Sequence, residues 1–219
     1  FLWALNLLYL KKNKIYQKFV IKFLKPVFLN DEISCLWDDK KELLKIIDKF
    51  GSCLVSIRCA DMASNYKRTN HGLNTSMDLS IKTPNAIKFE DLSEGLSVKR
   101  FCKTDPKHIG DLFRELEKLF GIDVLIEVVR LSSIIGMQIP GRDSIFSQCR
   151  INLKLTECQP SLTIKSLDHR FKLIKLDYAG INLNASLEAF FRPPPITSDN
   201  SKIIAEKTNL LNNKTYIIY

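Results

Sequence analysis

Apolar and polar positions along the chain predict a short first block of elements and a longer second block. Residues 2–10 form a strongly apolar segment, which predicts a buried helix that ends before Lys11. The alternation in YQKFVIKF, residues 16–23, predicts a strand. Three further strands are expected at 32–37, 42–47 and 53–59. Because short polar turns separate them, this block should be an antiparallel meander.

The second block begins with a strand at 97–102 and a helix start, with Thr104 or Asp105 as cap and Pro106 in the first turn. The segment 111–120, DLFRELEKLF, predicts an amphipathic helix that ends at Gly121. Its inner side should carry Leu112, Phe113, Leu116, Leu119 and Phe120. An apolar segment follows at 124–137, and strands are expected at 147–155, 161–166, 170–176 and 181–191.

Between these parts lies RLSSIIGMQIPGRDSIFSQ, residues 130–148, around which the chain is organised. Pro140 and Gly141 mark a sharp turn, and Asp143 and Ser144 are N-cap candidates for a helix that begins near Ile145. A glycine turn before a helix N-terminus presents free N–H groups and partial positive charge, which suit a carbonyl or oxyanion. Gly141 and Ser144 are therefore candidate substrate-binding residues, and a simple tight turn is the alternative.

Composition narrows the classes of protein that fit. The chain has 219 residues, 45% of them hydrophobic, which is ample for a packed core. Its net charge is +9, but the lysines are spread along the chain and form no basic run interleaved with aromatics, so a nucleic-acid partner is not expected. No apolar run reaches the roughly 18 residues of a membrane span. The opening FLWALNLLYL lacks the features of a signal peptide.

The six cysteines include no CxxC pair, so no metal site is expected, and most lie among apolar residues as reduced core thiols do. This pattern predicts a cytoplasmic protein.

Two segments match at a fixed offset: KIIDKFGSCLVSIRCA at 45–60 and IKLDYAGINLNASLEA at 174–189. Gly51 corresponds to Gly180 and Ala60 to Ala189, and the preceding strands follow in the same order. A helical segment should lead each meander, 2–10 in the first copy and the Ser144 region in the second. The chain is therefore expected to contain two copies of one unit, a helix with an antiparallel sheet.

A helix wrapped by an antiparallel meander describes the hot-dog fold, an α+β class. SSIIGMQIPGRDSIFS, DHRFKLIKLDYAG and AFFRPPP resemble the MaoC-like acyl dehydratases, the (R)-enoyl-CoA hydratase group, whose double hot-dog form pairs a catalytic with a degenerate half. FLWALNLL resembles the central helix of that family, and VIKFLKPVFLNDEI the strand-turn-strand after it. The resemblance covers nearly all of residues 1–197. It implies an enoyl-thioester hydratase or dehydratase whose substrate is an acyl-CoA or acyl-carrier thioester.

The family's catalytic loop, Gly-Asp-x-Asn-Pro-Ile-His, is not matched in this chain. By the resemblance, the loop of the first copy lies upstream of Phe1, and that of the second corresponds to 116–129, where Gly121 and Asp123 stand without the Asn-Pro-Ile-His. No catalytic residue is therefore assigned in this chain, although Asp123 is worth testing. His71, His108 and His169 are expected to be surface residues. Only Gly141 maps onto a functional position, the glycine of the oxyanion turn, with Pro140 in place of histidine.

The expected organisation is a first hot-dog unit at 1–60 that lacks its leading part, a linker at 61–94, a second, degenerate unit at 95–197, and a segment at 198–219. That last segment ends in strand-like NNKTYIIY, which resembles the first strand of the short-chain dehydrogenase/reductases and would place NAD(P) in a downstream domain. No cofactor is expected within the chain itself. The alternative function is a non-catalytic structural or acyl-binding module. A hot-dog thioesterase would need a carboxylate near the central helix. A homodimer is left open.

Overall fold

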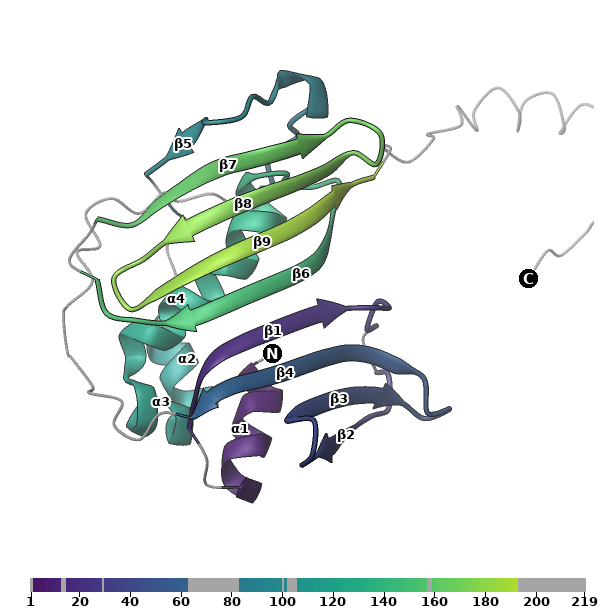
Figure 1. Cartoon of the computed structure of the whole chain (residues 1–219), viewed down its shortest axis with the longest axis vertical. Helices are drawn as coiled ribbons and strands as arrows, with labels where there is room; N and C mark the ends of the chain where they lie inside the picture. Colours follow the sequence, from purple (N-terminus) through teal and green to yellow (C-terminus); the bar gives the residue numbers. More distant parts are fainter. Residues whose placement is uncertain are drawn as a thin grey trace, which may run out of the picture.

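In the part of the chain that the structure describes, nine strands form one antiparallel sheet, and the long helices pack on one of its faces (Figure 1). This computed structural model describes residues 2–12, 15–28, 30–62, 83–99, 101, 106–156 and 159–192. The strands lie in the order β2-β3-β4-β1-β6-β9-β8-β7-β5. Their bounds are Tyr16–Phe23 for β1, Ile33–Asp38 for β2, Leu43–Asp48 for β3, Cys53–Met62 for β4, Ser97–Val98 for β5, Ser144–Leu153 for β6, Ser161–Asp168 for β7, Leu173–Ala179 for β8 and Leu183–Phe191 for β9.

The helices are α1 (Leu2–Lys12), η2 (Phe89–Asp91), α2 (Pro106–Leu112), α3 (Arg114–Phe120), α4 (Ile122–Ser133) and the short π-helix η3 (Ile134–Gln138). In the first unit, α1 is followed by four strands that pair in the order β2-β3-β4-β1. In the second, α4 is followed by four strands that pair in the mirrored order β6-β9-β8-β7. The two units therefore share one topology, and the fold is the double hot-dog that the pattern predicted.

The two units join along a seam where β1 pairs antiparallel with β6, with Val20 opposite Arg150. The repeat seen in the sequence falls on equivalent hairpins, β3–β4 in the first unit and β8–β9 in the second. The hairpins turn differently. In the first, the Asp48 carboxylate accepts the N–H groups of Phe50 and Ser52 at 2.9 and 2.8 Å, whereas Asp177 lies within β8.

The core fills the space between the helices and the inner face of the sheet. Strand burial alternates with period two, so the inward residues of β8 and β9 are nearly all buried. Side chains with no exposed surface come from both units: Ile57, Ile134, Ile174, Leu176, Leu183, Leu187 and Ala189. The fold is thus held by one hydrophobic core that runs through both units.

The amphipathic helix predicted at 111–120 is wrong in one respect, because the structure divides it into α2 and α3. Phe113 separates them with φ −129° and ψ 45°, outside the helical region. Its N–H still donates to the Ile109 carbonyl, and its own carbonyl accepts from Glu117, so both helices are closed by main-chain bonds. The break turns Leu112 outward, where it is 70% exposed rather than on the inner side.

The helix predicted to begin near Ile145 is wrong, since Ser144 begins strand β6 instead. Residues 144–153 pair with β9 on one side and β1 on the other, and these two ladders outweigh the local cap signal. The helix that leads the second meander is therefore α4, not the Ser144 region. The segment 116–129, matched to the catalytic loop, is α3 and α4.

The bounds of the other elements differ less from the predicted ones. Strand β8 begins at Leu173 rather than 170, because the Asp168 carboxylate accepts the N–H groups of Arg170 and Phe171 in the preceding turn. Strand β5 covers only two residues of the expected 97–102. Within the predicted linker, Phe89 is buried against the second unit, with its ring 5.1 Å from that of Phe191. Residues 63–82, with His71, and 193–219 lie outside the described residues, so the unit boundaries and the downstream reductase remain predictions.

Candidate functional site

A small apolar void lies on the helix side of the sheet, at the seam between the two units. Leu2 and Leu5 reach it from the first two turns of α1, and Phe120 and Val124 reach it from α3 and α4. The other lining residues are Phe19, Leu116, Leu125, Val128, Ile151 and Leu153. The void has a volume of about 10 Å³, which is the size of one water molecule. An acyl chain could enter here only if the lining side chains moved.

Gly141 and Ser144, the predicted substrate-binding residues, lie at the end of η3 and the start of β6. The Gly141 N–H donates to the Ile135 carbonyl at 2.9 Å, so in this structure it is occupied. The Ser144 hydroxyl donates to the carbonyls of Ile135 and Gly141 at 3.1 and 2.7 Å, and caps no helix. The substrate-binding assignment remains a prediction, but the helix N-terminus that motivated it is absent from this part of the chain.

Gly141 has a structural reason to be glycine. Its φ is +86°, in the region that side chains with a Cβ avoid, and a Cβ would collide with the Asn85 carbonyl. This close approach lets the Arg142 N–H donate to the Asn85 carbonyl at 2.8 Å. The Pro140–Gly141 turn thus fastens the segment before η2 to the base of β6.

A charged group that the sequence analysis passed over lies inside the second unit. Glu127, on α4, has no exposed surface, and Arg130, one turn later, is only 4% exposed. The two Glu127 oxygens accept the N–H groups of Ile181 and Asn182 at 2.9 and 3.0 Å. The carboxylate therefore holds the β8–β9 turn against the central helix.

The neighbours of Glu127 complete a buried polar cluster. The Arg130 Nη1 donates to the Tyr178 hydroxyl at 3.5 Å, and the guanidinium carbon lies 5.4 Å from the centre of the Phe101 ring. Gly180 permits the close packing, because a Cβ there would lie 2.7 Å from Glu127 Oε2 and 2.6 Å from the Tyr178 ring. The cluster is thus closely packed around the carboxylate.

Burial raises the pKa of Glu127 from 4.5 to about 7, since the charged form loses its hydration. The N–H groups of Ile181 and Asn182 and the charge of Arg130 act in the opposite direction but offset only part of this cost. Burial likewise raises the pKa of the Cys59 thiol to about 12, and that of Cys149 well above its usual value. Both thiols are therefore un-ionised core groups.

One sequence signal could have identified the cluster. Glu127 and Arg130 stand three residues apart in the mostly apolar segment 124–137, and residues at that spacing share one helix face. Charged residues on a buried face must find partners, so such a pair predicts an internal polar site. The partners of Glu127 in the β8–β9 turn, 54 and 55 residues later, and Tyr178 on β8, 48 residues after Arg130, could not be located from the pattern alone.

The predicted surface histidines that the structure describes are exposed. His108 lies on α2, and His169 lies in the β7–β8 turn with its ring 5.2 Å from that of Phe89. Asp123 lies in the first turn of α4, partly buried. None of these residues lines the seam void.

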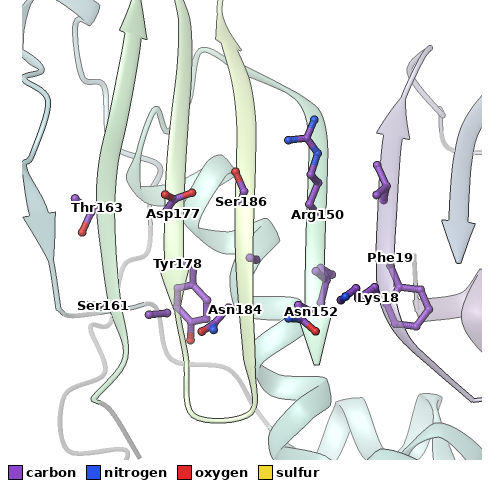
Figure 2. Close-up of a pocket in the computed structure, with 14 residues that line it drawn as sticks. Lys18, Phe19, Arg150, Asn152, Ser161, Thr163, Asp177, Tyr178, Asn184 and Ser186 are labelled. Carbon is purple, nitrogen blue, oxygen red and sulfur yellow. The ribbon is translucent and has the colours of Figure 1, made fainter. Parts of the chain in front are cut away.

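The opposite face of the sheet carries a larger, open groove of about 570 Å³. Figure 2 shows Lys18 and Arg150 on the side formed by β1 and β6, and Thr163 and Asp177 on the side formed by β7 and β8. The groove is also lined by smaller side chains, among them Val20, Ala179 and Ser186.

Within the described residues, no group of three or more histidine, cysteine or acidic side chains is arranged to hold a metal ion. Across the same residues, none of the helices has the length and apolar character needed to cross a membrane.

These features define a double hot-dog protein with an apolar seam beside the first central helix. No family model matches the chain, and no curated protein does. Several solved structures resemble it. A MaoC-like dehydratase aligns with a TM-score of 0.46 and 13% identity, covering 82% of this chain and 76% of the other.

Two more solved structures represent the related classes. The (R)-hydratase from A. caviae involved in PHA biosynthesis has a TM-score of 0.33 and 14% identity, covering 47% of this chain and 99% of the other. A putative thioesterase from Novosphingobium aromaticivorans has a TM-score of 0.45 and 8% identity, covering 88% and 85%. The neighbours are thus MaoC-like dehydratases and thioesterases. The fold assignment rests on the strand order and on the placement of the helices.

Proposed function

We propose that this chain is part of an enoyl-thioester hydratase or dehydratase that acts on CoA- or carrier-linked acyl groups. The observation that carries the proposal is the apolar void at the N-terminal turns of α1, between the two units. The resemblance of FLWALNLL to the family's central helix puts the thioester at this end of α1 and the acyl chain in the seam.

In the proposed reaction, water adds across the double bond of the enoyl thioester, with its hydroxyl on carbon 3 and a proton on carbon 2. By the resemblance, an Asp and a His in a catalytic loop that would precede α1 remove a proton from water and deliver a proton to carbon 2. Such acid–base help contributes about 10² to 10⁴-fold. The N–H groups at the N-terminus of α1 would polarise the thioester carbonyl, because they form the positive end of the helix dipole.

The residues described here would hold the acyl chain and exclude water. Leu2 and Leu5 on α1, with Phe120 and Val124 on the facing helices, offer only apolar surface. We expect the second unit to support the wall rather than the chemistry, because both oxygens of Glu127, the buried carboxylate of its central helix, are engaged by the β8–β9 turn. That engagement also argues against a thioesterase that would use Glu127.

A non-catalytic structural or acyl-binding module is the second candidate. It is favoured by the small size of the void, about 10 Å³, and by the lack of any imidazole or carboxylate among its lining residues. The two candidates differ in whether a longer protein that includes the upstream loop turns over substrate.

An assay of crotonyl-CoA hydration tests the proposal, with the loss of absorbance of the enoyl thioester as the readout. It compares residues 1–219 with a protein extended upstream of Phe1. We expect no hydration above background for residues 1–219 and measurable turnover for the extended protein. Asp123→Asn is the matched variant and should change neither result. Turnover by residues 1–219 that Asp123→Asn abolishes would place the chemistry in the second unit. Release of free CoA thiol without hydration would indicate a thioesterase.

A further inference from the structure

The outer face of the sheet gathers cations that are far apart in the sequence. Because side chains alternate along a strand, the outward positions of β3, β4, β1 and β6 lie on one surface. Five of them are basic, and together they define the basic face: Lys18, Lys22, Lys45, Arg58 and Arg150. All five are exposed. This arrangement is independent of the seam and of the proposed acyl-thioester function.

Strand register shows that the basic face is compact. Arg58 and Arg150 stand on either side of Val20, one strand away on each side. Lys18 and Lys22 precede and follow Val20 by two residues on β1, and Lys45 lies one strand beyond Ser56, the partner of Lys22. With strands about 4.8 Å apart, the five cations cover an area roughly 15 Å across.

Few carboxylates offset this charge. Glu188 lies 4.0 Å from Arg150, and Asp177 pairs at 3.2 Å with Lys165, farther along the sheet. Among the residues that the structure describes, no ion pair is found for Lys22, Lys45 or Arg58. A cluster of like charges on a rigid sheet attracts an oppositely charged partner, since its repulsion is relieved when the partner binds.

The side chains between the cations indicate the kind of partner. Val20, Ser56 and Ala60 separate them, and none is an aromatic ring on which a nucleic-acid base could stack. Apolar residues adjoin them instead: Leu36, 54% exposed, lies opposite Lys45, and Leu43 lies opposite Arg58. The open groove of about 570 Å³ begins beside Lys18 and Arg150 and could receive a projecting side chain (Figure 2). Arginine is enriched in protein interfaces and their rims are polar, so Arg58 and Arg150 beside apolar side chains, with lysines around them, fit such an interface.

We propose that the basic face is the docking surface for a partner protein that presents clustered carboxylates. The cations pair with those carboxylates, while Val20, Leu36 and Leu43 contact apolar side chains of the partner. The same face of a second copy does not suit the surface, because the five cations would then meet five like charges.

Binding of fluorescein-labelled poly-L-glutamate, measured by anisotropy at low and moderate salt, tests the proposal. The variant Lys22→Glu/Arg58→Glu reverses two charges at the centre of the basic face. The control Lys88→Glu/Lys99→Glu makes the same change in net charge at two exposed residues away from the basic face, one that precedes η2 and one that follows β5, the strand at the far edge of the sheet. We expect the first variant to weaken binding about tenfold or more and the control to weaken it less than about threefold.

Near-UV circular dichroism verifies that both variants keep the native packing. The neutral variant Lys22→Gln/Arg58→Gln should lose an intermediate amount of affinity for poly-L-glutamate. Equal losses in the two double variants would overturn the proposal, because binding would then follow net charge alone. So would tighter binding to a labelled single-stranded oligonucleotide of equal charge than to poly-L-glutamate, which would make the partner a nucleic acid.

Discussion

Replacing Glu127 by glutamine should change how the stability of this protein depends on pH. The carboxyl has a pKa of about 7 in the folded protein, against an ordinary value of 4.5, because burial removes its hydration. The folded state therefore holds a proton between those values that the unfolded chain has released. By linkage, the stabilisation is fully present below about pH 4.5 and is lost as the pH rises to about 7.

The expected magnitude follows from this difference in pKa. At about 1.4 kcal/mol per pKa unit, the rise from 4.5 to about 7 corresponds to about 3 kcal/mol. Glutamine does not titrate, and the other ionisable groups are common to both proteins. The free energy of unfolding of the wild type, minus that of Glu127→Gln, should thus fall by about 3 kcal/mol between pH 4.5 and 7.5.

Urea unfolding followed by tryptophan fluorescence at half-unit pH steps measures this difference. Glu115→Gln is the matched control, since Glu115 is an exposed residue of α3 paired with Lys118 at 2.8 Å, and its difference should vary by less than about 0.5 kcal/mol. A Glu127→Gln difference that is flat over this range, or that rises with pH, would refute a buried carboxyl with a raised pKa.

Three further substitutions test the packing and the seam. Gly180→Ala should lower the free energy of unfolding by about 1–3 kcal/mol, because a Cβ would lie 2.6 Å from the Tyr178 ring. The control Gly136→Ala should not lower it, since nothing lies within 4 Å of a Cβ at that position. Equal losses in the two variants would contradict the close packing around Gly180. Gly141→Ala should cost about 2 kcal/mol or more, because φ is +86° and a Cβ meets Asn85, and an unchanged melting temperature would contradict this. In the extended protein, Phe120→Val should shift the ratio of kcat/KM for 2-hexenoyl-CoA over crotonyl-CoA about tenfold or more upward; an unchanged ratio would place the acyl chain elsewhere.

Local patterns predicted most strands because each depends on neighbouring residues. Alternation at 16–23 gave β1 with its observed bounds, and the matching segments at 45–60 and 174–189 are equivalent hairpins. The repeat could predict the shared topology because both units bury the same face of the same hairpin. Pairing between β1 and β6, which joins the units, carried no local signal.

The errors lie where distant contacts decide the structure. Asp143 and Ser144 have good capping chemistry, yet ladders to β1 and β9 make 144–153 a strand. The Gly141 N–H was predicted to be free, but it donates to the Ile135 carbonyl. That carbonyl belongs to a π-helix, which the sequence pattern did not predict. The basic face was also missed, because its five cations are far apart in the sequence and become neighbours only through the order of the strands in the sheet.

Photo-crosslinking most directly tests the seam as the site of the acyl chain. A diazirine at the end of the acyl chain of an acyl-CoA, irradiated with the protein extended upstream of Phe1, labels the residues that the chain contacts. Mass spectrometry of the peptides should place the label within α1 and residues 114–128, and excess crotonyl-CoA should abolish it. Labelling confined to the outer groove, or labelling that crotonyl-CoA does not reduce, would contradict an acyl site between the two hot-dog units.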